Sequence, residues 1–203
     1  MSDSIVVTGF GPFFGHTINA SWEAVRLLPD EINGITIIKK EIPVQYSHIQ
    51  TKIPQLWEEH KPLLVIHVGV SGEAKQITLE KCAKRDGYKR LDVTGATHST
   101  GTACDSGEEC IYTGINVADV CAKLNNTGKL NACMSSNAGR YLCEFIYYTS
   151  LNIDPSKVLF IHVPPLDNPY TAKELSEGLL DIIEHALEQL YSQKEKNLST
   201  NII

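Results

Sequence analysis

The chain has 203 residues, 42% of them hydrophobic, and a formal net charge of -6 at pH 7. This length can bury one substantial core and leaves little room for a second, so we expect a single domain over residues 1–193 and a polar tail over residues 194–203. Acidic and basic residues are mixed along the whole chain, and the lack of a basic stripe argues against nucleic acid as a partner.

The N-terminal sequence MSDSIVVTGF lacks the basic and longer apolar segments of a secretory signal peptide. No stretch approaches the roughly 20 apolar residues that a membrane span requires. We therefore expect a cytoplasmic protein without membrane contacts, whose six cysteines are reduced thiols. The cysteines lack paired C-x-x-C spacing and no histidines gather near them, so the sequence predicts no metal site.

Short β-branched runs alternate with amphipathic stretches, a pattern typical of an α/β sheet covered by helices on both faces. Strands are predicted at residues 4–8, 34–44 and 63–68, the last uniformly apolar, as a central strand must be. Helices are predicted from Asn19, a suitable capping residue, to near Pro29, and over residues 46–60.

Beyond Gly69 this alternation stops, and residues 87–110 are rich in Gly, Thr, Asp and Ser, which predicts a long functional or mobile loop. The later elements are predicted as a helix at 116–124, a strand at 130–135, a helix opening at Ala138, a strand at 157–163 and a helix at 171–191.

Cys143 lies in the segment SSNAGRYLC, between the strand predicted to end at Ser135 and the helix predicted to open at Ala138. In the first turns of a helix, unpaired N–H groups and the positive end of the dipole favour the thiolate form of a cysteine. Cys143 is therefore a candidate nucleophile. A small buried thiol without reactivity is the alternative, and position alone does not exclude it.

His162 stands in the apolar segment VLFIHV, followed by two prolines. Near the carboxyl end of a strand it would face the crevice where such sheets bind ligands, within reach of Cys143 at the end of the neighbouring strand. The alternative is a core histidine hydrogen-bonded to backbone. His67 is also in an apolar strand but lies further from its end, where it is expected at most to support the site. Glu80, in QITLEK, is either the carboxylate that orients His162 or a solvated surface charge.

The segment TGFGPFFG contains the pattern G-x-G-x-x-x-G after a strand, which raises the alternative of a nucleotide-binding protein. Pro12 removes one N–H donor from such a turn, and no helix opens at the last glycine, so the phosphate signal is weak. Phe10 and Phe13 suit the walls of a small flat apolar pocket better, unless both simply pack in the core.

Five segments taken together resemble the pyroglutamyl-peptidase I family of cysteine omega peptidases: TGFGPF, NASW from Asn19, ITLEKCA around Glu80, NAGRYLC around Cys143 and FIHVPPL around His162. The resemblance follows the same order from about Ile5 to the last helix. It implies a three-layer α/β/α sandwich around an open twisted mixed sheet, and hydrolysis of an N-terminal pyroglutamyl (5-oxoproline) residue from peptides through a thioester, without metal or cofactor.

The resemblance also assigns roles to residues. It implies Cys143 as nucleophile, His162 as base and Glu80 as the acid that orients it, with Phe10 and Phe13 sandwiching the lactam ring and Asn19 bracing that pocket. These triad residues argue against the alternative of a catalytically silent binder of pyroglutamyl-capped peptides on the same fold.

Two departures accompany the resemblance. Ala20 stands where many relatives have proline, and the 87–110 segment resembles animal relatives more than bacterial ones. Arg90 has the spacing from Glu80 of an arginine that bacterial relatives place near the oxyanion and animal relatives need not have. The oligomeric state is expected to be a monomer or a homo-oligomer.

Overall fold

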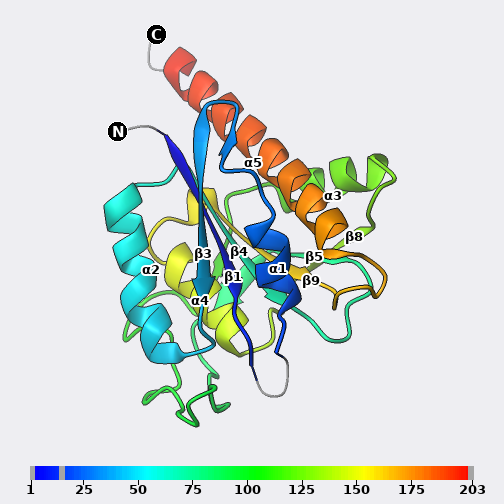
Figure 1. The fold of residues 1–203 in the computed structure, drawn as a ribbon. Coiled ribbons are helices and arrows are strands. Elements are labelled where there is room, and N and C mark those ends of the chain that lie inside the picture. The colour runs from blue at the N-terminus through cyan, green and yellow to red at the C-terminus, as the bar shows by residue number, and fades with distance from the viewer. Residues whose placement is uncertain (1–2, 14–16, 201–203) are drawn as a thin grey trace.

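The computed structural model describes residues 3–13 and 17–200, with side chains up to residue 196. A seven-stranded sheet with strand order β2-β3-β1-β4-β9-β5-β8 forms its centre, between helices on both faces (Figure 1). The strands are β1 (Ser4–Phe10), β2 (Glu31–Ile32), β3 (Ile35–Ile42), β4 (Leu64–Val70), β5 (Ile77–Glu80), β8 (Ala132–Ser135) and β9 (Val158–Val163).

Strand direction changes once within the half of the sheet that contains β9. Strands β3, β1, β4 and β9 are parallel, β5 pairs antiparallel with β9, and β8 is parallel to β5. The predicted fold class, a three-layer α/β/α sandwich with a mixed sheet, is confirmed. The expectation that the strand before Cys143 neighbours the strand of His162 is wrong, because β5 lies between β8 and β9.

Two hydrophobic cores, one on each face of the sheet, hold the helices. Helices α2 (Tyr46–His60) and α4 (Leu142–Leu151) cover one face, around buried residues such as Ile49 and Phe145. Helices α1 (Ala20–Arg26), α3 (Val117–Asn126) and α5 (Ala172–Thr200) cover the other, around Val25 and Leu179. Strands β1 and β9 are buried along their whole length because helices cover both faces of the sheet.

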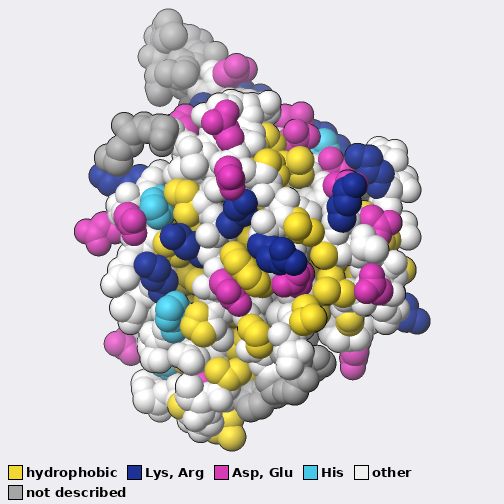
Figure 2. All heavy atoms as spheres, viewed as in Figure 1, with side chains coloured by type: hydrophobic (Ala, Val, Ile, Leu, Met, Phe, Trp, Pro, Cys, Tyr) yellow, Lys and Arg dark blue, Asp and Glu magenta, His cyan; other side chains and the backbone are white. Residues whose placement is uncertain are grey.

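A small second sheet, β6 (Cys82–Lys84) paired with β7 (Cys110–Tyr112), closes the base of the predicted loop, which is irregular as expected. Among the described residues, no helix combines the length and apolar character needed to cross a bilayer. The face seen in Figure 2 intersperses acidic with basic side chains, in keeping with the mixed charge of the sequence.

Two predicted boundaries need correction. Helix α4 begins at Leu142, not at Ala138, because Gly139 and Arg140 have left-handed φ angles of 98° and 51° that a right-handed helix cannot accommodate. Helix α5 continues to Thr200, so residues 194–200 of the predicted polar tail are helical, and 201–203 lie outside the described residues. The domain boundary at residue 193 stays a prediction.

Candidate active site

Glu80 and His162 meet where two antiparallel strands lie side by side. In the β5–β9 register Thr78 stands opposite His162, and Glu80 stands opposite Phe160, one pleat away. The two side chains therefore project from the same face of the sheet. His162 Nδ1 and Glu80 Oε1 are 2.9 Å apart, in a region where the residues are only 8% and 2% exposed. This buried contact rules out a solvated role for Glu80.

Cys143 reaches the same place from α4, in which it is the second residue. Its sulfur lies against Gly69 near the carboxyl end of β4, and Gly69 pairs in register with His162. A Cβ atom at Gly69 would lie 2.7 Å from Cys143 Sγ and 2.9 Å from Phe160 Cζ, so only glycine allows this approach. The sequence prediction missed Gly69, although a glycine inside an apolar strand can indicate such a close contact.

The charge state of His162 depends on both neighbours. Burial alone would lower the pKa of His162, but hydrogen bonds with Cys143 and Glu80, together with the negative charges of those groups, outweigh it and raise that pKa to about 10. The imidazole therefore holds a proton at neutral pH and can pair with a thiolate on Cys143.

The start of α4 is fixed by a buried carboxylate next to Cys143. Glu144 is fully buried; its Oε1 accepts hydrogen bonds from Lys84 N at 3.0 Å and from Arg140 Nη1 at 2.7 Å, and its Oε2 accepts one from Arg140 N at 2.7 Å. Tyr141, the residue at the N-cap, makes no side-chain capping bond. The first N–H groups of α4 are thus left for another acceptor at the position of Cys143.

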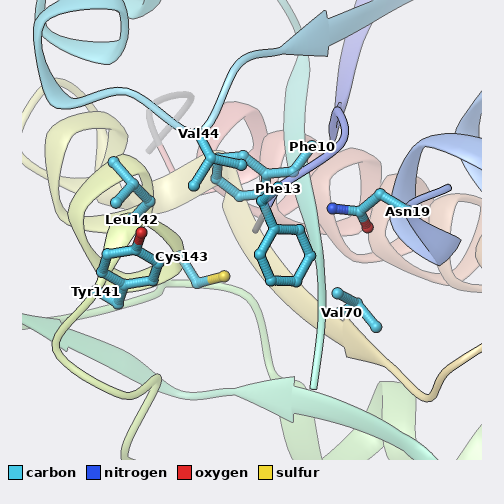
Figure 3. A pocket seen from close by; sticks show the side chains of 8 residues that line it. All are labelled: Phe10, Phe13, Asn19, Val44, Val70, Tyr141, Leu142 and Cys143. Atoms are coloured by element: carbon cyan, nitrogen blue, oxygen red, sulfur yellow. The ribbon is translucent and has the colours of Figure 1, made fainter. Parts of the chain in front are cut away.

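A small, mostly apolar pocket opens beside the Cys143 sulfur (Figure 3). Phe10 and Phe13 face Tyr141 and Cys143 across it, and the sulfur points toward the phenylalanine side. The eight lining residues are Phe10, Phe13, Asn19, Val44, Val70, Tyr141, Leu142 and Cys143. Sequence analysis identified four of them; Val44, Val70, Tyr141 and Leu142 were missed because nothing in their local sequence distinguishes them from core residues.

Asn19 links the turn after β1 to the start of α1. Its Nδ2 donates to Gly11 O at 3.0 Å, while its Oδ1 accepts hydrogen bonds from Ser21 N at 3.1 Å and from Ser21 Oγ at 2.8 Å. Ser21 Oγ in turn accepts a bond from Phe10 N at 2.9 Å. One buried amide thus caps α1 as predicted and holds the backbone that carries Phe10.

A wider groove continues from this pocket past the histidine. It shares Phe13, Tyr141 and Cys143 with the pocket and adds His162 and Leu166 on its further side. Because Cys143 lines both the pocket and the groove, an extended molecule that occupies both places one of its own bonds beside the sulfur.

Arg90 also lines the groove, with its guanidinium stacked 4.2 Å from the centre of the Tyr141 ring.

The remaining candidates from the sequence, His67 and the glycine turn, lie outside the site formed by Glu80, Cys143 and His162. His67 is buried in the core, between Thr8 Oγ1 and Ser150 Oγ, each 2.7 Å from a ring nitrogen. The glycine turn leads to a seven-residue helix whose Ser21 N–H already donates to Asn19, which disfavours a phosphate site. Gly15 lies outside the described residues. Within the described part of the chain, no three His, Cys, Asp or Glu residues are grouped to hold a metal ion.

Comparison with known proteins shows the family to which the chain belongs. A family model described as pyroglutamyl peptidase matches residues 3–181. Pyroglutamyl-peptidase 1 of Homo sapiens is 44% identical over 196 residues, covering 95% of this chain and 94% of that protein. Pyrrolidone-carboxylate peptidase of Thermococcus onnurineus is 33% identical, covering 91% and 94%. The solved pyrrolidone carboxyl peptidase from Thermus thermophilus has a TM-score of 0.82 and 28% identity, covering 89% of this chain and 99% of that one. The chain therefore belongs to the pyroglutamyl peptidase family, a family of cysteine omega peptidases, which confirms the resemblance inferred from its sequence.

Proposed function

We propose that this chain hydrolyses the amide bond that follows an N-terminal pyroglutamyl residue in peptides. The observation that carries the proposal is the hydrogen-bonded Glu80–His162 pair next to Cys143, at the mouth of a pocket walled by Phe10 and Phe13. A pyroglutamyl residue has no free α-amino group, so a flat neutral ring must be recognised by aromatic faces and a few hydrogen bonds, as this pocket provides.

The proposed reaction has two covalent steps. The Cys143 thiolate attacks the pyroglutamyl carbonyl carbon, and the resulting oxyanion accepts hydrogen bonds from N–H groups at the start of α4. The His162 imidazolium then gives its proton to the departing amine as the C–N bond breaks, which leaves a thioester. Neutral His162 next takes a proton from water, the hydroxide displaces the thiolate, and pyroglutamate leaves. Glu80 holds the imidazole in the orientation needed for both transfers.

Further expectations belong to the same proposal. The substrates are N-terminally pyroglutamylated peptides, whose remaining residues leave through the groove beyond His162. We propose that the protein works in the cytoplasm, as a monomer or a homo-oligomer, with no nucleic acid or membrane partner.

A fluorogenic pyroglutamyl amide tests the proposal. The wild type should turn it over, Cys143→Ser should be inactive, and Cys133→Ser, a partly buried cysteine on β8, should match the wild type. We also expect His162→Ala to lose more activity than Glu80→Gln, because His162 transfers protons whereas Glu80 only positions the imidazole. Undiminished turnover by Cys143→Ser would refute the mechanism, and a folded, reduced wild type without turnover would favour a silent binder.

A further inference from the structure

The irregular loop between β6 and β7 contacts the pocket wall through residues 90–93, here called the strap. Around the strap the loop is well anchored, since Tyr88 is fully buried with its hydroxyl donating to Lys84 O. The strap contacts two parts of the pocket wall.

The first part of the wall comes from the junction of β3 and α2. Val93 N donates to Val44 O at 3.2 Å, and Val44 lines the pocket. One side chain of the strap, Asp92, also accepts a bond from Tyr46 N at 3.2 Å, which caps the start of α2 in place of Gln45. The Tyr46 hydroxyl in turn donates a hydrogen bond to Arg90 O, also at 3.2 Å.

The second part of the wall comes from the residue before α4. The Tyr141 hydroxyl donates to Leu91 O at 2.9 Å, and the Arg90 guanidinium covers the Tyr141 ring at 4.2 Å. The Tyr46 and Tyr141 rings meet edge to face with their centres 6.3 Å apart. Thus four consecutive residues join two wall segments that lie almost a hundred positions apart in the sequence.

Asp92 is the residue that fixes the strap itself. It is only 2% exposed, and its Oδ1 accepts bonds from Thr94 N, Thr94 Oγ1 and Ala96 N at 2.8, 2.6 and 3.2 Å. A buried carboxylate with this many donors holds its surroundings firmly, since each lost bond would leave a buried polar group unpaired.

We propose that residues 90–93 set the shape of the ring pocket by tying Val44 to Tyr141, and that Asp92 is the positioning residue that anchors them. The inference rests on the proposed function and adds to it: recognition of the pyroglutamyl ring then depends on a loop that contributes none of the triad. The triad stands on β5, β9 and α4, so loosening the strap should weaken ring binding and leave the chemical step nearly intact.

Asp92→Ala is the direct test. We expect the KM for a pyroglutamyl amide to rise at least ten-fold, the affinity for free 5-oxoproline to fall by a similar factor, and kcat to stay within about three-fold. Asp92→Asn keeps one acceptor oxygen and should restore part of the loss. Asp105→Ala removes an exposed carboxylate from the same loop and should match the wild type.

Tyr141→Phe keeps the test valid if Asp92→Ala does not fold. It removes only the hydroxyl bond to Leu91 and should raise KM several-fold while iodoacetamide inactivates the enzyme at the wild-type rate. Unchanged KM and 5-oxoproline affinity in both folded variants would refute the role proposed for the strap but not the proposed function. A fall in kcat with KM unchanged would refute the role of the strap in the same way. A wild type that neither cleaves the amide nor binds 5-oxoproline would overturn the proposed function as well.

Discussion

The distance between Cys143 and the sheet is set by the absence of a side chain at position 69. Gly69→Ala would place a methyl group 2.7 Å from the sulfur, with Phe160 blocking the other side at 2.9 Å. Since a misplacement of about 1 Å can cost a reaction about 100-fold, we expect kcat/KM to fall by at least about that factor.

A second crowded glycine gives the control for Gly69→Ala. In Gly114→Ala the new Cβ would lie 2.9 Å from Ser156 Cα, so this variant should lose stability but keep the kcat/KM of its folded fraction. Steady-state kinetics with thermal unfolding of both variants separates the two effects. Equal losses of kcat/KM in both would mean that the role of Gly69 is general packing.

The pKa of His162 predicts the alkaline limit of the reaction. With that pKa raised to about 10, the imidazolium that the proposed mechanism uses to protonate the leaving amine persists through neutral pH and is lost as the pH rises through about 10. The kcat/KM profile should therefore fall on its alkaline side near that value. Glu80→Gln removes one of the charges that favour the imidazolium, so its alkaline limb should move to lower pH. An unmoved limb would place the titration on another group.

At the scale of elements, α1 depends on Asn19 both for its cap and for its link to the pocket. Asn19→Ala should cost about 1 kcal/mol of stability, the usual loss of an N-cap, and should also raise KM, because Gly11 loses its partner. Asn116→Ala is a matched control, since Asn116 Oδ1 accepts a bond from Asp119 N at 3.1 Å at the start of α3. It should cost similar stability in urea unfolding and leave KM unchanged. A KM change in both variants would contradict a specific role for Asn19.

Long periodic elements were predictable from sequence, while most of the shortest strands were not. Helix α2 was predicted at its observed bounds, and Asn19 and Asn116 mark the starts of α1 and α3. Strands β5, β6 and β7 are only three or four residues long, too short to show a period, and were missed. The start of α4 was misplaced because a non-glycine residue, Arg140, adopts a left-handed conformation that its sequence does not signal.

At the scale of the whole molecule, strand order could not be deduced from the chain. The prediction placed Glu80 with His162 by resemblance, whereas the physical cause is that β5 lies between β9 and β8 and runs antiparallel to β9. Contacts of this kind depend on residues far apart in sequence, such as Gly69 with Cys143, and no local pattern encodes them. The three residues proposed as the triad could thus be named from the sequence, whereas their geometry could not.

One buried network joins the sheet to both helices on its α2 and α4 face. His67 on β4 lies between Thr8 of β1 and Ser150 of α4, and Ser150 also accepts a 3.0 Å bond from Trp57 of α2. Burial lowers the pKa of His67 to about 3. The folded protein therefore keeps this ring neutral down to about pH 3.

This network makes the whole fold sensitive to acid. In the unfolded chain His67 takes up a proton near its ordinary pKa of about 6.5, whereas in the folded chain it does so only near 3. His67 therefore has no effect on the pH dependence of stability above pH 6.5, and below it lowers the free energy of unfolding by about 1.4 kcal/mol per pH unit. His67→Gln does not titrate, so the wild-type advantage over it, measured by urea unfolding, should shrink at that rate between pH 6 and pH 4. A constant difference would mean that His67 is protonated in the folded state, and that the two short bonds to Thr8 and Ser150 hold an imidazolium.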